Sequence, residues 1–200
     1  MSHDRMIETA RPIIVAVKGD PVRPGDVPRV ELDLAKFHSG RWALQLDSAF
    51  AHRGAPAVIL AEGVACLAVA WWAQLSPRSY MAMIHGAVFL SPLDVRFGQE
   101  SVAASARLSP ATGLPFPSVV VNTAYPFVDR VLALADGWGS SFVDTDSPLD
   151  LQATNRRGVP TDAAAQLLAF LPLLHAPEQP SLAPREPVFE FDTHEPTGIV

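Results

Sequence analysis

The chain has little cysteine and little charge. Cys66 is the single cysteine among 200 residues, which excludes a disulfide framework and a metal site built from several thiolates. Charged residues make up 18% of the chain, and 15 Lys and Arg stand against 21 Asp and Glu. The net charge of −6 offers no basic surface to a nucleic acid or an anionic membrane, so neither partner is expected.

Neither the amino terminus nor the most apolar stretch in the middle of the chain contains a hydrophobic run long enough to span a membrane. Residues 1–6 are polar and lack the apolar segment of a signal peptide. Gly63–Pro77 contains no Asp, Glu, Lys or Arg, but it is shorter than the roughly 20 residues that cross a bilayer. We therefore expect a cytoplasmic protein in which this run forms a buried helix.

Short apolar runs alternate with helical patterns along the chain. Six runs are predicted as strands: Pro12–Val17, Arg29–Leu34, Pro56–Ala61, His85–Leu90, Ser118–Asn122 and Ser141–Asp144. Four stretches are predicted as helices: Ser39–His52 capped by Ser39, Gly63–Leu75, Val128–Gly137 closed by Gly137, and Thr161–Leu171. This alternation predicts an α/β fold, with a doubly wound, mostly parallel sheet and helices on both faces in three layers.

The composition divides the chain into a leader (residues 1–11), one domain (12–172) and a proline-rich, acidic tail or arm (173–200). The tail holds five prolines, five acidic residues and one basic residue. Its short apolar patch contains Phe189 and Phe191. We expect this arm to lie along another surface, so that a protein partner or self-association into an oligomer would use these two side chains.

The turn that joins the third predicted strand to the apolar helix has the sequence context of a nucleophile elbow. Gly63 and Ala65 supply the small residues that such a turn needs. The nucleophile itself is absent, because Gly63 stands at the centre of the turn.

Four stretches together resemble the small serine hydrolases of the YdeN and retinoblastoma-binding protein 9 type. They are Pro56–Ala73, His85–Val95, Phe116–Val121 and Ala133–Ser140, the last of which includes the sequence LADGWGS. Within the first stretch, the family's pattern VAHSLGCLAVAHWA aligns without gaps with LAEGVACLAVAWWA, residues 60–73. The resemblance covers roughly residues 12–171 and implies an α/β-hydrolase fold.

The same resemblance implies a catalytic triad that this chain does not carry. The family's nucleophilic serine falls on Gly63, and Glu62 replaces the histidine before it. The family's acid falls on Tyr125 and its histidine on Leu149. The segment after the first strand, which begins near Gly19, is too short for the family's loop and helix with an oxyanion donor.

We therefore expect a degenerate hydrolase with no catalytic residue, no metal and no cofactor, retained for binding or assembly. One alternative is an active esterase or amidase with relocated groups, for which the sequence offers Ser91, Thr123, Asp94 and Asp129. Another is a small-molecule binding module that uses the vestigial crevice. The residues expected to line that crevice, beside Gly63 and Tyr125, are Gly19, Glu62, Val64 and Asn122.

Four further features have simpler structural interpretations. Cys66 is expected to pack inside the helix, and Asp129 to cap the helix that follows it. One of Trp71 and Trp72 should fill the core, and the other could cover a subunit contact. Three acids could bind a cation and two arginines an anion, although solvated loops are the simpler and favoured interpretation of both; these residues are Asp144, Asp146, Asp150, Arg156 and Arg157.

Overall fold

A computed structural model describes residues 10–21, 26–51, 53–96, 99–100, 112–123, 127–145 and 161–174. Six strands are β1 (Arg11–Val17), β2 (Arg29–Leu32), β3 (Ala57–Glu62), β4 (Ile84–Leu90), β5 (Ser118–Asn122) and β6 (Ser141–Asp144). The α-helices are α2 (Arg41–Ala51), α3 (Val64–Leu75), α4 (Arg78–Met81), α6 (Val128–Trp138) and α7 (Thr161–Leu168). Two 3-10 helices are η1 (Leu34–Ser39) and η2 (Leu171–Leu174).

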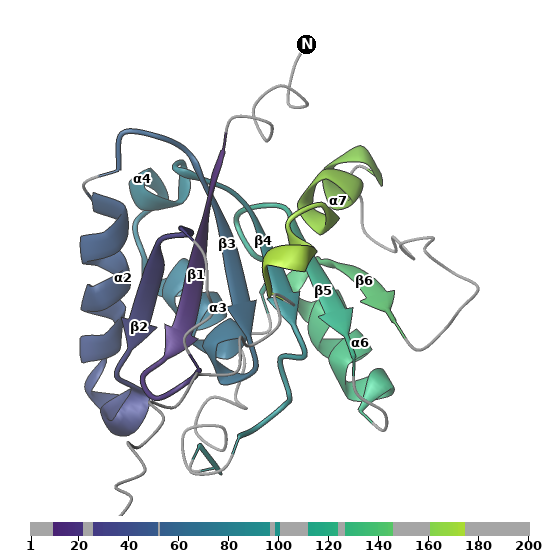
Figure 1. The fold of residues 1–200 in the computed structure, drawn as a ribbon, viewed down its shortest axis with the longest axis horizontal. Helices are drawn as coiled ribbons and strands as arrows, with labels where there is room; N and C mark the ends of the chain where they lie inside the picture. Colours follow the sequence, from purple (N-terminus) through teal and green to yellow (C-terminus); the bar gives the residue numbers. More distant parts are fainter. Residues whose placement is uncertain are drawn as a thin grey trace, which may run out of the picture.

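The six strands form one sheet in the order β2-β1-β3-β4-β5-β6 (Figure 1). Every neighbouring pair is parallel. The chain leaves β1 toward β2 and later returns to the other side of β1 with β3, so the sheet is doubly wound. The predicted α/β class is confirmed, and the gap between the carboxyl ends of β1 and β3 is the switch point where such sheets place their sites.

Helices cover both faces of the sheet, as predicted. Side chains of α2, α3 and α6 share one apolar cluster with one face of the strands, and α7 and η2 share a second cluster with the other face. Figure 1 shows α3 and α6 behind the sheet and α7 in front of it. Most strands are apolar on both sides because both of their faces are buried.

The edge strand β2 is the exception. Its sequence alternates charged and apolar residues, with Val30 and Leu32 turned into the core and Arg29 and Glu31 turned away from it. This alternation is typical of a strand covered on one face only. The strand ends at Leu32 rather than at the predicted Leu34, since η1 begins there.

Three predicted helix ends need correction. The helix α2 begins at Arg41, because η1 occupies the chain up to Ser39, whose Oγ accepts a hydrogen bond from the Arg41 N–H at 3.4 Å. The helix α6 extends past Gly137 to Trp138 and is capped by Gly139, which adopts the left-handed conformation (φ 69°) that closes helices. The helix α7 ends at Leu168, where η2 follows within a few residues.

The apolar run after β3 forms the buried helix that the sequence predicts. Nine of the twelve residues of α3 are buried. Within the described ranges, no helix is long and apolar enough to cross a membrane.

Candidate functional site

Gly63 lies at the sharp turn between β3 and α3, beside the switch point of the sheet. Its backbone has φ 58° and ψ −133°. Residues other than glycine adopt this backbone conformation only with strain. The Gly63 N–H donates a hydrogen bond to the Leu90 carbonyl at 2.9 Å, which fixes the turn against the end of β4. The fold thus keeps a strained elbow at the point where the sequence places the family's nucleophile.

The segment that follows β4 closes the space above this elbow. A Cβ atom added to Gly63 would lie 2.9 Å from the carbonyl oxygen of Asp94, a distance that real Cβ atoms essentially never show. The segment is itself tightly turned, since Ser91 has φ 45° and its carbonyl accepts the Asp94 N–H at 2.9 Å. Because the obstacle is backbone rather than a flexible side chain, any residue larger than glycine requires this segment to move.

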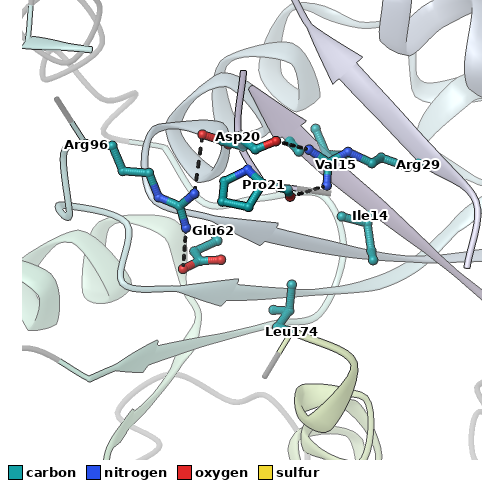
Figure 2. Close-up of a pocket in the computed structure, with 9 residues that line it drawn as sticks. Ile14, Val15, Asp20, Pro21, Arg29, Glu62, Arg96 and Leu174 are labelled. Carbon is teal, nitrogen blue, oxygen red and sulfur yellow. Dashed lines mark hydrogen bonds and ion pairs between the residues drawn. The ribbon is translucent and has the colours of Figure 1, made fainter. Parts of the chain in front are cut away.

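Arg96, at the end of the same segment, bridges two carboxylates at the carboxyl edge. Its guanidinium lies 3.2 Å from Glu62 Oε1 and 3.6 Å from Asp20 Oδ1 (Figure 2). Gln99 Nε2 donates to the same Asp20 oxygen at 3.1 Å. These contacts join the ends of β1, β3 and β4 across the crevice.

Asp20 also organises the loop after β1. Its Oδ2 accepts the Val17 N–H at 2.9 Å, and its own N–H donates to the Val17 carbonyl. Gly19 makes this tight turn possible with φ 95°. Arg29 donates to the carbonyls of Asp20 and Pro21 at 3.1 and 2.9 Å. Two carboxylates and two arginines therefore line this edge together, and their charges are paired with one another or with backbone carbonyls.

One pocket at this edge is lined by described residues, and it is small. Its cavity volume is about 20 Å³, enough for roughly one or two water molecules and far below the roughly 300 Å³ of a small-molecule site. Its lining residues are Ile14, Val15, Ala16, Asp20, Pro21, Arg29, Glu62, Arg96 and Leu174. Of the predicted crevice residues, Glu62 lines this pocket, and Gly19, Val64 and Asn122 do not.

Two of the candidate relocated nucleophiles do come together. The Ser91 and Thr123 hydroxyl oxygens lie 2.5 Å apart at the carboxyl ends of β4 and β5, and Ser91 is buried. Asn122, beside them, is buried too, and its carbonyl accepts the N–H and Oγ1 of Thr145 at 3.0 Å each. Asp129 lies apart from them, exposed in the first turn of α6.

Asp129 does not cap its helix as predicted. The cap position belongs to Phe127, and no side chain there hydrogen-bonds the backbone. As a first-turn acid, Asp129 still interacts favourably with the helix dipole.

Cys66 is buried one turn into α3 and is poorly suited to act as a nucleophile. Its Sγ lies 3.6 Å from the Leu90 carbonyl oxygen, to which the thiol donates. Burial, and then the charge of Glu62, raise the pKa of the Cys66 thiol well above its ordinary value. A thiol with a raised pKa is seldom ionised, and the thiolate is the reactive form. The predicted packing role agrees with this position.

The tryptophan pair divides as the sequence predicts. Trp72 is buried, stacks on Phe50 with ring centroids 5.0 Å apart, and donates from Nε1 to Asp47 Oδ1 at 2.8 Å. Trp71 is half-buried and packs on the edge of the same core cluster. Its proposed subunit contact stays a prediction.

Several sequence-predicted residues lie outside the described part of the chain. They are Tyr125, Asp146, Leu149, Asp150, Arg156, Arg157, Phe189 and Phe191. Asp144 is described and ends β6. Among the described residues, no three His, Cys, Asp or Glu side chains gather as metal ligands would.

The sheet order, the layers and the elbow define an α/β-hydrolase-like fold. A crystal structure of a YdeN-like hydrolase from Pectobacterium atrosepticum is similar in fold, with a TM-score of 0.50, 16% identity, and coverage of 70% of this chain and 79% of that one. A family model described as serine hydrolase matches residues 27–153. The chain therefore belongs to the serine hydrolase family, and the resemblance seen in the sequence is confirmed. A search of curated proteins found no match.

Sequence reasoning missed the residues that close the site. Arg96 is 34 positions from Glu62 along the chain and further still from Asp20. Asp94 acts through its backbone carbonyl, which carries no side-chain signal. A charged residue in the segment after β4 was the available hint, and only the tertiary structure shows what it contacts.

Proposed function

We propose that this member of the serine hydrolase family does not hydrolyse substrates by the Ser-His-Asp mechanism and is retained for binding or assembly. The observation that carries the proposal is the position of Gly63. The elbow has a strained backbone but no nucleophilic side chain. The Asp94 carbonyl occupies the space that the Cβ atom of a serine at position 63 would need.

The charges of the crevice support the same conclusion. Acyl transfer builds negative charge on the substrate oxygen, and enzymes stabilise it with hydrogen-bond donors near the nucleophile. Here Glu62 precedes Gly63, and Asp20 holds the loop after β1. Arg96 is shared between these two carboxylates. An oxyanion formed at this edge would have to compete with two carboxylates for the Arg96 guanidinium.

A fluorophosphonate probe tests the loss of this mechanism directly. We expect the full-length protein to remain unlabelled in mass spectrometry under conditions that label an active serine hydrolase completely. The Gly63→Ser variant should remain unlabelled too, because the restored hydroxyl has no room and gains no base. Thermal unfolding of the variant shows whether it has folded before the probe is added.

Stoichiometric labelling of one serine in the native protein would contradict the proposal. The hydrogen-bonded pair of buried Ser91 and exposed Thr123 gives this outcome a specific form. Labelling that disappears in the Ser91→Ala variant and persists in Thr123→Val would establish a relocated nucleophile. The first of these variants removes the candidate nucleophile, and the second removes its hydrogen-bond partner.

The small pocket argues against a small-molecule module. A space above Gly63 would favour ligand binding, whereas the Asp94 carbonyl closes it in the described structure. The pocket that the described residues line at this edge, of about 20 Å³, has room for water rather than for an organic ligand. Assembly through protein surfaces is therefore the role that we favour.

For assembly, we propose self-association through the arm that contains Phe189 and Phe191. Light scattering of the full chain should give a mass above that of the 21.5 kDa protomer. Replacing both phenylalanines by serine should lower this mass to that of the protomer, because aromatic anchors dominate such contacts. A matched double variant at exposed Leu44 and Leu75 should leave the mass unchanged. An unchanged mass in the phenylalanine variant would exclude the arm.

A further inference from the structure

The amino edge of the sheet, opposite the closed crevice, carries an arginine pair. Arg11 is the first residue of β1 and stands beside Ala57 of β3 in the sheet register. Its N–H donates to the Pro56 carbonyl at 2.9 Å. Side chains alternate along a strand, so Arg11 projects from the same face as Ile13 and Val15, the face that α2 covers.

Arg53 reaches the same place from the end of α2. Its guanidinium lies 5.9 Å from the centre of the Phe50 ring, which belongs to the core cluster on that face. Only two residues separate Arg53 from Pro56, the partner of the Arg11 backbone. Figure 1 shows the end of α2 and the start of β1 at the same end of the sheet.

Within the described residues, neither arginine has an ion-pair partner. The ion pairs there involve Arg29 and Arg96 instead. Asp47, one and a half turns before Arg53, is bonded to the Trp72 indole. The Nη1 group of Arg53 is buried and has no hydrogen-bond partner. A guanidinium stays charged in proteins, so a buried N–H without an acceptor is costly.

The electrostatics agree with the geometry. Burial, and after it the positive charge of Arg11, lower the pKa of Arg53. The two like charges therefore lie at the same end of the sheet, where the Arg11 backbone is bonded to Pro56 and Arg53 is partly buried. An anion between them would accept the free N–H groups and remove the repulsion at once.

We propose that Arg11 and Arg53 form a binding site for an oxyanion, a phosphate or carboxylate group held between the two guanidinium groups. Each guanidinium presents planar N–H donors that match two oxygens of such a group. The site faces away from the crevice and is independent of the proposed function. The net charge of the whole chain is −6, so unspecific attraction does not account for binding.

Calorimetric titration of the full-length protein with inorganic phosphate, and separately with succinate, tests the site. Chloride at equal ionic strength is the baseline. We expect saturable binding of one anion per chain, with amide shifts in ¹H–¹⁵N spectra confined to the surroundings of Arg11 and Arg53. The titrant with the lower dissociation constant shows whether phosphate or carboxylate is the preferred group.

Substitutions assign the binding to the pair. Arg53→Gln should raise the dissociation constant of the anion by about tenfold or more. This is the change expected for the loss of at least one charged hydrogen bond. Arg53→Lys keeps the charge but loses the planar donors, so it should weaken binding as well. Arg41→Gln is the matched control, because it removes an exposed arginine at the start of α2, whereas Arg53 lies just beyond the end of that helix.

Three outcomes would overturn the proposal. They are no saturable binding of either anion, equal loss of binding in the Arg41→Gln control, and unchanged binding in Arg53→Gln. If Arg53→Gln does not fold, Arg11→Gln decides, since the Arg11 side chain is exposed. Unchanged binding in that folded variant would then refute the role of the pair.

Discussion

The arginines at the carboxyl edge and at the amino edge of the sheet differ in whether described carboxylates pair with them. At the carboxyl edge, Arg96 lies between Glu62 and Asp20 and draws the segment after β4 across the crevice. At the amino edge, Arg11 and Arg53 lie together without a carboxylate among the described residues. The first arrangement is internally compensated, and the second has no compensating carboxylate in the part of the chain that the structure describes.

This difference indicates where the molecule can still bind something. A compensated edge offers an incoming group little, because each new contact must replace an existing one. An uncompensated edge gains both hydrogen bonds and relief of repulsion. The edge that holds the site in related hydrolases is thus the less available one here.

The largest expected effect comes from adding one methyl group at Gly63. Gly63→Ala should lower the free energy of unfolding by about 3–5 kcal/mol, since it combines a strained backbone with overpacking. Gly139→Ala is the matched control, because Gly139 also has positive φ but nothing lies within 4 Å of an added Cβ. It should cost about 1 kcal/mol. Urea denaturation measures both variants.

Equal losses in the two glycine variants would show that the Asp94 carbonyl does not close the elbow. A small loss at Gly63 would have the same meaning. The closed carboxyl edge would then be an open one, and the contrast between the two edges would disappear.

Replacing an arginine by glutamine should change the free energy of unfolding by a smaller amount, downward at the carboxyl edge and, if at all, upward at the amino edge. Arg96→Gln should lower the free energy of unfolding by about 0.5–1 kcal/mol, a modest value because the paired side chains are 38%, 28% and 16% exposed. Arg11→Gln should leave the stability unchanged or raise it by less than about 0.5 kcal/mol, because it removes a repulsion.

Urea denaturation at low ionic strength and at 1 M NaCl measures these two arginine variants. Salt screens both interactions, so both effects should shrink together. If Arg11→Gln destabilised the protein as much as Arg96→Gln does, the amino edge would be compensated too. That result would remove the basis of the comparison.

The strands and the buried helix were predictable because their signals are local. Apolar runs such as Ser118–Asn122 and Ser141–Asp144 form strands at the predicted residues. The helix ends were less predictable. Gly137 and Gly139 both suit a helix end, and the sequence does not tell which of them adopts the left-handed conformation.

The absence of a serine at the elbow was also visible in the sequence, since Gly63 falls at the centre of a turn with a characteristic spacing. The effect of this glycine on the space above the elbow was not visible in the sequence. The same glycine could have left an open pocket, which is why a binding module was a reasonable alternative. The Asp94 carbonyl closes the space, and no residue type predicts the position of a backbone oxygen from a distant segment.

The sequence by itself determined the fold class, the family and the absence of a serine at the elbow, because residue types at fixed local spacing carry that information. Only the tertiary structure decided that the Asp94 carbonyl blocks the elbow, that Arg96 bridges Glu62 and Asp20, and that Arg11 and Arg53 lie at the same amino edge. Those contacts depend on which strand ends and helix ends are neighbours in the sheet, and neighbours in space can be far apart along the chain.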